Sequence, residues 1–153
     1  MRQVLTLLCL LCCMAGIVTG CTKDELIGAY NSVLQLVGSK DLTKNRQLQG
    51  ERRFGEDHYV GTYTADYVDF TGEELLFGGT ALEREGGSEI VVTCSLTQSG
   101  GTARLTWRSG TEEDQVLLEG AGTYNGAITL PAATNLLVVE AEGFTGIISL
   151  ECK

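Results

Sequence analysis

Basic residues are scarce in this chain of 153 residues. Eleven lysines and arginines stand against 20 aspartates and glutamates, which gives a formal net charge of −9. A chain of that charge repels a phosphate backbone, so the composition excludes a nucleic-acid binder that depends on phosphate contacts. Only one long apolar run occurs, which excludes a polytopic membrane protein. With 43% hydrophobic residues, the chain can still bury the core of one ordinary domain.

Residues and motifs of common catalytic centres are also missing. The chain has one histidine, His58, and it lacks Gly-x-Ser-x-Gly, His-Glu-x-x-His and Gly-x-x-x-x-Gly-Lys. These patterns would indicate a serine nucleophile, a zinc site and a phosphate-binding loop. Cys9-x-x-Cys12 lies inside the apolar run, so it is not a redox or zinc motif. The sequence therefore favours a protein that is not an enzyme and that needs no cofactor to fold.

Residues 1–20 have the plan of a secretory signal peptide. Arg2 precedes an apolar stretch, 4–18, that only Thr6 interrupts. This stretch of about 15 residues is shorter than the roughly 20 residues that span a bilayer comfortably. We therefore expect residues 1–20 to be removed from the mature protein.

The four residues Val18-Thr19-Gly20-Cys21 resemble the lipobox of bacterial lipoproteins. In that family an aliphatic residue, a small or hydroxylated residue, and Gly or Ala precede an invariant cysteine; Val18 stands where leucine is preferred. The resemblance implies diacylglycerol on the Cys21 thiol and cleavage before it by the lipoprotein signal peptidase. Two or three acyl chains together anchor a protein stably. We expect a lipid-anchored, extracytoplasmic protein of a bacterial cell membrane or envelope.

Cysteine use in the mature chain follows from this assignment. Of six cysteines, only Cys94 and Cys152 remain after signal removal and lipidation, and alternation places both on core-facing sides of strands. In an exported domain, two cysteines suggest one disulfide, which would stabilise the fold by about 4 kcal/mol. The alternative is two separate buried thiols. The sequence leaves both open because it does not give a Cα separation.

The segment 22–37 predicts one amphipathic helix. Its apolar residues follow a helical period: Leu26, Ile27, Tyr30, Val33, Leu34 and Val37. We expect this apolar stripe to pack on the domain that follows. The chain then divides into the signal peptide (1–20), a lipid anchor with helix and connecting segment (21–56), and a folded domain (57–153).

From His58 onward apolar residues recur at every second position. Eight strands are expected, at 58–64, 74–78, 89–97, 102–108, 115–119, 123–130, 136–142 and 146–152. Glycine-rich turns such as Gly86-Gly87 and Asn125-Gly126 separate them at a spacing of about ten residues. No helical pattern interrupts this rhythm. It predicts a mainly β fold, an antiparallel β-sandwich of about eight strands, jelly-roll-like, that follows the helix.

The last strands carry a loose family resemblance. The residues are Gly122-Thr123-Tyr124, Ile128-Thr129-Leu130, Asn135-Leu136-Leu137-Val138-Val139 and Phe144-Thr145-Gly146. They resemble the close of small jelly-roll modules of secreted bacterial proteins, which include carbohydrate-binding modules and pre-peptidase C-terminal domains. The resemblance implies a β-sandwich. The resembling residues include no binding motif, so the resemblance does not indicate which ligand the protein would bind.

Acidic residues gather between 66 and 74. Asp66, Asp69 and Glu73 are weak candidates for a Ca²⁺ site, because this hard cation takes several oxygen ligands. Two carboxylates in the same segment could instead serve a small hydrolase. The sequence offers neither an EF-hand spacing nor an obvious cleft. Solvated acidic loops are the simpler interpretation.

Aromatic residues give the sharpest candidate for a binding surface. Tyr59, Tyr63 and Tyr67 share one side of an extended segment, and Trp107 lies in a later strand. Rings in a row over small residues would form a flat platform for sugar rings, with Tyr59, Tyr63 and Trp107 as its members. The opposite side of the tyrosine segment is more polar, which favours the alternative that these rings lie in the core.

These features favour a non-catalytic binding or structural module held at a membrane. Its partners would be the lipid membrane, through acylated Cys21, and a protein or glycan ligand that the sequence does not identify. A glycan-binding surface module is the first alternative, and a small carboxylate-dependent hydrolase is the second. Exposed aromatic rings would favour the former, and a cleft with two carboxylates the latter.

Overall fold

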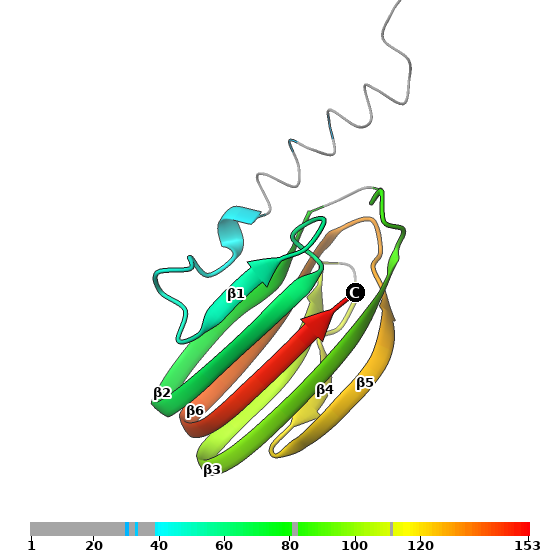
Figure 1. Ribbon diagram of the computed structural model, residues 1–153. Coiled ribbons are helices and arrows are strands. Elements are labelled where there is room, and N and C mark those ends of the chain that lie inside the picture. Colours follow the sequence, from blue (N-terminus) through cyan, green and yellow to red (C-terminus); the bar gives the residue numbers. More distant parts are fainter. Residues whose placement is uncertain (1–29, 31–32, 34–38, 81–82, 111) are drawn as a thin grey trace, which may run out of the picture.

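The computed structural model describes residues 30, 33, 39–80, 83–110 and 112–153 (Figure 1). A short 3₁₀ helix, η1 (Ser39–Asp41), precedes six strands: β1 (Glu51–Phe54), β2 (Gly61–Thr80), β3 (Glu89–Ser109), β4 (Gln115–Glu119), β5 (Gly122–Thr129) and β6 (Thr134–Cys152). Every strand pairing is antiparallel, which confirms the mainly β prediction. Within the described residues, no helix has the length and apolar character to cross a membrane.

The expected N-terminal features lie largely outside the described residues. This applies to the signal peptide, to the lipobox residues Val18, Thr19, Gly20 and Cys21, and to most of the helix expected at 22–37. Tyr30 and Val33 are described, and they are 57% and 58% exposed. These two members of the apolar stripe are therefore not buried against the sheet, contrary to expectation.

The three longest strands bend near their middles, and the sheet folds into two layers. β2, β3 and β6 contain 20, 21 and 19 residues. Asp69, Gly101 and Gly143 at these bends have φ values of 51°, 64° and 57°, and Gly120 between β4 and β5 has 70°. Glycine adopts this left-handed region without strain, and aspartate tolerates it. The bends fall side by side, so the sheet folds along one line (Figure 1).

The two layers are built from halves of the long strands. One layer runs β1, first half of β2, second half of β6, first half of β3, then β5. The other runs second half of β2, first half of β6, second half of β3, then β4. The eight predicted strands are these half-strands together with β4 and β5. Fewer strands are observed than predicted because backbone pairing continues through the bends.

Alternating residues from both layers form the core between them. Tyr63, Val92, Leu105, Val139 and Phe144 are each at most 1% exposed. Full burial of an aliphatic or aromatic side chain of this kind contributes about 1.5–3 kcal/mol. The core therefore spans both layers, and polar groups inside it need partners within the protein.

Cys94 and Cys152 are both free and buried. Cys94 lies opposite Leu150, and Cys152 lies opposite Val92, so the two cysteines are diagonal neighbours on β3 and β6. Diagonal neighbours lie about 7–8 Å apart, at the upper limit of what a disulfide spans without backbone movement. Burial raises the pKa of Cys94 to about 11 and that of Cys152 to about 12, and the nearby Cys94 adds to the second shift. The structure thus has two buried thiols in place of the bridge.

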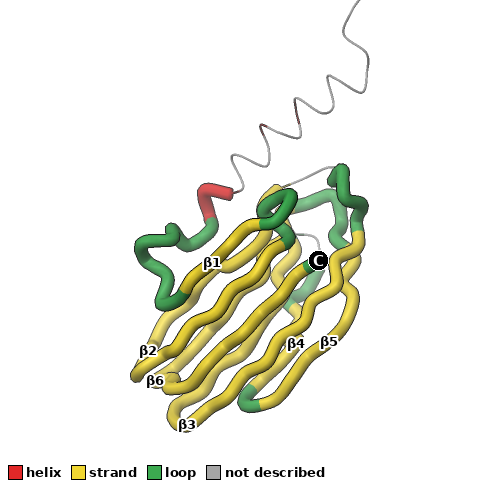
Figure 2. Tube along the Cα trace, viewed as in Figure 1, coloured by secondary structure: helices red, strands yellow, loops and turns green. Residues whose placement is uncertain are grey.

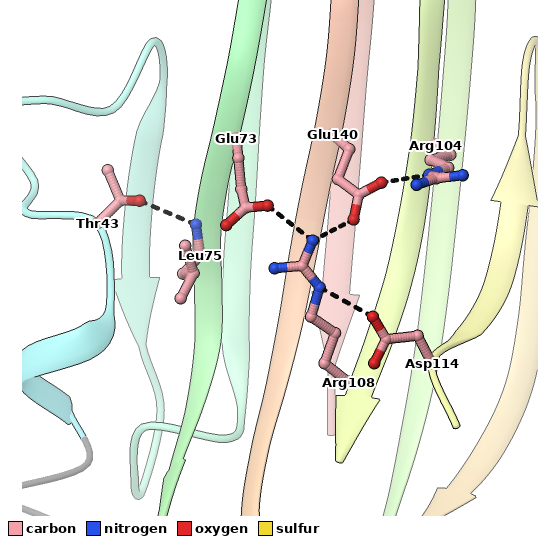
Figure 3. Close-up of polar contacts among 7 residues, drawn as sticks. All are labelled: Thr43, Glu73, Leu75, Arg104, Arg108, Asp114 and Glu140. Carbon is pink, nitrogen blue, oxygen red and sulfur yellow. Dashed lines mark hydrogen bonds and ion pairs between the residues drawn. The ribbon is translucent and has the colours of Figure 1, made fainter. Parts of the chain in front are cut away.

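The segment before β1 is tied to the sandwich. The Thr43 N–H donates to the Leu75 carbonyl at 3.0 Å, and the Leu75 N–H donates to Thr43 Oγ1 at 2.8 Å (Figure 3). Arg52 in β1 is 9% exposed and donates to the carbonyls of Leu75 and Leu76 at 3.1 and 2.8 Å. The folded domain therefore begins before residue 57, whereas the sequence analysis expected it to begin at residue 57.

Candidate binding site

The flat aromatic platform, one of the two alternatives for these rings, is not present. Tyr59, Tyr63 and Trp107 are 2%, 0% and 5% exposed. Tyr63 alternates with the outward-facing Thr62 and Thr64, whereas Tyr59 and Trp107 each have a buried neighbour in the chain; all three rings lie inside the sandwich. The inward-facing alternative is the one observed. The three residues then separate into two different surroundings.

Tyr63 belongs to a closed polar cluster in the core. The hydroxyls of Tyr63 and Tyr67 donate to Glu74 Oε2 at 2.6 and 2.5 Å, and their oxygens lie 2.9 Å apart. The Gln49 N–H donates to Glu74 Oε1 at 2.6 Å. The bend in β2 makes this possible, because it places the strand's two halves in facing layers. Glu74, only 1% exposed, therefore links the two layers and the segment before β1.

Burial and nearby charges shift the pKa values of the two tyrosines and of Arg52. Burial, followed by the hydrogen bond to Glu74, raises the pKa of both Tyr63 and Tyr67. Burial lowers the pKa of Arg52, while the nearby Tyr63 and Glu74 act to raise it. The guanidinium also donates to the Thr43 carbonyl and to Asn45 Oδ1 at 2.7 and 2.8 Å. Each acidic oxygen of Glu74 has a partner, so the cluster has a structural role.

Tyr59 lies at the opposite end of the sandwich from the bends, where loops 55–60, 83–88 and 130–133 gather (Figure 2). Its N–H donates to Asp57 Oδ1 at 2.8 Å, and Asp57 pairs with Arg84 at 2.5 Å. The Arg84 guanidinium lies 5.9 Å from the centre of the Tyr59 ring. Burial, followed by the Asp57 charge, raises the Tyr59 pKa to about 12. The ring is thus held firmly and its hydroxyl stays protonated.

Three buried polar atoms at this end have no partner within the described residues. They are Tyr59 Oη, Trp107 Nε1 and Asn135 Oδ1. Asn135 donates its two amide hydrogens to the carbonyls of Pro131 and Ala133 at 2.9 and 3.1 Å, which fixes which side of the amide carries the oxygen. Leaving such groups unpaired costs about 1–3 kcal/mol each. All three residues line one cavity of about 10 Å³, the size of a single water-sized group.

A larger cavity of about 240 Å³ adjoins the small one. The two share Tyr59, Leu130 and Asn135 as lining residues, and Arg84 and Ser88 line only the larger cavity. Its wall therefore combines an aromatic ring, an aliphatic side chain and polar groups, which is typical of small-molecule sites. The two cavities therefore lie side by side at this end of the sandwich. We call this pair the loop-end cavity.

The acidic residues between 66 and 74 are not brought together. Asp66 is exposed on the outer face of one layer, Asp69 lies at the bend, and Glu73 lies on the outer face of the other layer. Within the described residues, no group of three His, Cys, Asp or Glu side chains is placed to hold a metal ion. Glu74 is sealed in the core. Among the described residues, the segment therefore forms neither the Ca²⁺ site that was considered as an alternative nor a cleft with two carboxylates.

Glu73 instead belongs to an ion-pair network on the outer surface (Figure 3). Arg108 reaches Glu73 at 2.7 Å and Asp114 at 3.3 Å, and it also pairs with Glu140, which binds Arg104. The hydrogen bond to Glu73 is the main cause that raises the Arg108 pKa. Burial acts to raise the Glu140 pKa, but hydrogen bonds from Arg104 and Arg108 outweigh it and lower that pKa. The network pairs its charges internally.

Two buried polar residues, Glu74 and Asn135, were missed as individual sites by the sequence analysis. Both stand at inward positions of a strand, Glu74 beside Leu76 and Asn135 beside Leu137. A polar residue at an inward position is a usable signal, because a buried polar group needs a partner. The sequence did not show that Glu74 finds its partners while the Asn135 oxygen has none within the described residues.

Comparisons with known proteins give a distant likeness of fold. Neither a described protein family nor a curated protein matches the sequence. Among solved structures, the unliganded carbohydrate-binding module CBM1 of BiXyn10A has a TM-score of 0.36 and 9% identity, over 69% of this chain and 86% of that one. The C-terminal CBM6 module of LamC, a laminarinase from Zobellia galactanivorans, has a TM-score of 0.27 and 9% identity, over 74% and 95%.

A third structure, CsCBM6-3 from Clostridium stercorarium in complex with cellobiose, has a TM-score of 0.25 and 13% identity, over 76% of this chain and 90% of that one. At these TM-scores the comparisons establish only a distant similarity to β-sandwich folds of carbohydrate-binding modules. The nature of any ligand has to be argued from the loop-end cavity itself.

Proposed function

We propose that this protein is a non-catalytic binding module that takes a neutral, hydroxyl-bearing ligand, such as a sugar ring, in the loop-end cavity. The observation that carries the proposal is the set of three unpartnered, buried polar atoms: Tyr59 Oη, Trp107 Nε1 and Asn135 Oδ1. Partial satisfaction of a buried polar group is costly, so a site of this kind favours a ligand that supplies the missing partners.

A hydroxyl group matches this set of atoms. Tyr59 and Trp107 offer two donors, and Asn135 Oδ1 is an acceptor. A hydroxyl has two lone pairs and one hydrogen, so it can accept from both donors and donate to the amide oxygen. A carboxylate has no hydrogen for Asn135, and an ammonium has no lone pair for the two donors. One hydroxyl of the ligand would enter the small cavity, and its ring would occupy the larger one.

Charge at the cavity also favours a neutral ligand. Arg84 is the cation that lines the larger cavity, and Asp57 already pairs with it at 2.5 Å. The net charge of −9 gives anionic ligands no long-range attraction. The order of the half-strands in the two layers supports the finer proposal of a jelly-roll module, in which such end loops are placed to carry the site.

The test is ligand-dependent thermal stability of the full chain. Neutral mono- and oligosaccharides are screened, and deoxy analogues of any hit follow, with Ca²⁺ and EDTA as a separate arm. A ligand that binds only the folded state adds about 2.7 kcal/mol at 100 times its Kd. We expect one sugar class to raise the melting temperature and one deoxy analogue of it to lose the effect. Ca²⁺ and EDTA are expected to leave the melting temperature unchanged.

Variants assign the binding to the cavity. Tyr59→Phe removes one donor and keeps the ring, so we expect weaker sugar binding with an intact fold. Tyr124→Phe is the matched control, because Tyr124 is a partly buried tyrosine on β5 that does not line either cavity. Equal binding by Tyr59→Phe and the wild type would contradict the proposed site. A flat response to the whole panel would contradict the ligand class.

We propose in addition that the protein is held on the outer side of a bacterial cytoplasmic membrane or in the envelope through acylated Cys21. The support is the lipobox resemblance of Val18-Thr19-Gly20-Cys21 after an apolar stretch. Cys21→Ala is expected to abolish processing and to move the protein out of the detergent phase. Unchanged processing and partitioning would contradict the proposal, and Cys94→Ala is the matched cysteine control.

A further inference from the structure

The strands at the sheet edges differ in how they are protected. β1 carries Glu51, Arg52 and Arg53 within four residues, and β4 ends in Glu119 after the acidic run 112–114. β5 has eight residues, none of which is charged and none of which is proline. Charged side chains and prolines are the usual means by which an edge strand avoids pairing with another chain. β5 lacks both.

The outward backbone groups of β5 follow from the ladder. Val91 and Lys153 exchange two backbone hydrogen bonds, at 2.8 and 2.9 Å, so Val91 faces β6. Backbone groups alternate in direction along a strand, so Val92 and Cys94 face β5, where they pair with Gly126 and Tyr124. The backbone N–H and C=O groups that point away from β3 are therefore those of Thr123, Asn125, Ala127 and Thr129.

No other strand of the described part covers this edge. β5 pairs with β3, and the remaining strand pairings do not involve it. Figure 1 shows β5 at the outer border of its layer, without a neighbour beyond it. Its outward side chains at Thr123, Asn125, Ala127 and Thr129 are exposed. The strand thus presents a continuous row of hydrogen-bonding groups to solvent.

We propose that β5 pairs with β5 of a second copy of this chain, antiparallel and related by a two-fold axis near Gly126. In this register Thr123 lies opposite Thr129 of the partner subunit, and Asn125 lies opposite Ala127 of the partner subunit. These are the residues whose backbone groups point outward, so each pair can exchange two hydrogen bonds. The two sheets then join into one continuous layer across the dimer.

The self-complementary register favours a second copy as the occupant, and charge does not oppose the contact on β5 itself. The chain has a net charge of −9, so two copies repel each other over most approaches. β5 is a neutral strand, and the proposed register places no charged residues opposite one another. Threonine lies opposite threonine, and such pairs are favourable across antiparallel strands. A two-fold axis also makes the contact self-complementary and closed, which limits assembly to a dimer.

The test combines sedimentation with amide hydrogen exchange on the full chain in a neutral detergent. We expect a dimer that dissociates on dilution. We expect the amides of Thr123, Asn125, Ala127 and Thr129 to exchange about tenfold or more slowly in the dimer than in the diluted protein. The amides of Tyr124 and Gly126 already pair with β3, so they serve as internal controls. A monomer at all concentrations overturns the proposal, and so does protection that is independent of concentration.

Variants locate the contact on β5. Ala127→Pro removes one outward N–H without touching the ladder to β3, and we expect it to be a monomer, whereas Ala127→Val stays a dimer. If Ala127→Pro disturbs the fold, the pair Thr123→Lys and Asn125→Lys replaces it, with Thr93→Lys on the outer face of the interior strand β3 as control. A dimer that persists in the folded edge variants overturns the proposal.

Discussion

Two groups of buried tyrosine hydroxyls lie in one sandwich and differ in their partners. Tyr63 and Tyr67 donate to Glu74, which receives a third hydrogen bond from Gln49. Tyr59 shares a cavity with Trp107 and Asn135, and no partner for its hydroxyl exists within the described residues. Both groups have closely similar burial. Burial alone therefore does not separate a structural polar cluster from a binding site.

What separates them is the count of donors and acceptors. The Glu74 carboxylate is closed, because two hydroxyls and one N–H donate to its two oxygens, and only the neighbouring Arg52 Nε lacks a partner there. The loop-end cavity is open, with two donors and one acceptor unmatched. A closed cluster stabilises the fold, whereas an open one stores a cost that a ligand can remove. Substitutions in the two groups should therefore affect different measurements.

The largest effect is expected for Glu74→Ala. The substitution leaves the hydroxyls of Tyr63 and Tyr67 and the Gln49 N–H unpaired, and it leaves Arg52 without a nearby countercharge. We expect the free energy of unfolding to fall by about 3–5 kcal/mol, measured by chemical denaturation. Its neighbour provides the control: Glu73→Ala, on the surface, should cost about 1 kcal/mol or less. Equal losses would show that Glu74 is not closing the cluster.

Unfolding at alkaline pH tests the burial of both groups of tyrosine hydroxyls and of the two cysteine thiols. The folded-state pKa of Cys94 is raised from 9.0 to about 11, and that of Tyr59 from 10.0 to about 12. Groups with raised pKa values contribute stability that is fully present below the unfolded value and is lost as pH rises through the folded value. We expect the free energy of unfolding to be flat to about pH 9 and then to fall towards pH 12 by about 1.4 kcal/mol per pH unit for each titrating group, and the melting temperature to fall with it.

The control for this titration is Tyr59→Phe. The substitution removes one group with a raised pKa and keeps Tyr63, Tyr67 and both thiols. Most of the loss of stability at alkaline pH should therefore remain. A melting temperature that rises or stays constant between pH 9 and 12 would contradict the burial of these groups.

A smaller effect is expected for removing one hydroxyl from each group. Tyr63→Phe breaks a 2.6 Å hydrogen bond to a buried carboxylate, and we expect a loss of about 1–3 kcal/mol. Tyr59→Phe removes a buried hydroxyl without a partner, so in the absence of ligand the free energy of unfolding should rise by about 1–3 kcal/mol. Denaturation of both variants in one buffer makes the comparison, which fails if Tyr59→Phe costs as much as Tyr63→Phe.

The smallest effect is expected on the outer surface. Arg108 pairs with three carboxylates, but its side chain is 29% exposed and those of Glu73 and Asp114 are 43% and 55% exposed. Solvent screens such pairs, so Arg108→Ala should cost about 1 kcal/mol or less, and the cost should shrink at high salt. Arg53→Ala, with a side chain 74% exposed, is the control with no expected change. If Arg108→Ala lowered the free energy of unfolding as much as Glu74→Ala, the number of ion-pair partners would matter more for stability than the burial of the charged group.

Much of the fold could be predicted from the sequence because it depends on local patterns. Alternation of apolar residues located the half-strands, and glycine-rich turns located most of their ends. The continuity of β2, β3 and β6 could not be predicted in this way. A bend that carries Asp69 or Gly143 at positive φ has the same local composition as a turn that ends a strand. Only the partner strand, far along the chain, shows that pairing continues through it.

The candidate site was predictable only in part. Alternation correctly predicted that Tyr59, Tyr63 and Trp107 are buried. It did not predict that Tyr59 and Trp107 line a cavity whereas Tyr63 belongs to the Glu74 cluster. That separation depends on the loops that bring Tyr59 to the end of the sandwich and on the bend that carries Glu74 to Tyr63. Both are contacts between distant residues. The platform alternative is not observed because the side that these rings share faces inward, as the polar residues on the opposite side indicate.

The position of β6 has a consequence for how the protein is made. β6 is the last strand along the chain, and it lies between β2 and β3 in both layers. β2 and β3 do not pair with each other, so a nascent chain that ends before residue 134 holds two long strands without their common neighbour. Gly61 meets its partner only when Cys152 has been synthesised. Folding should therefore begin after translation of the domain is complete and proceed slowly, since its decisive contacts join the most distant residues.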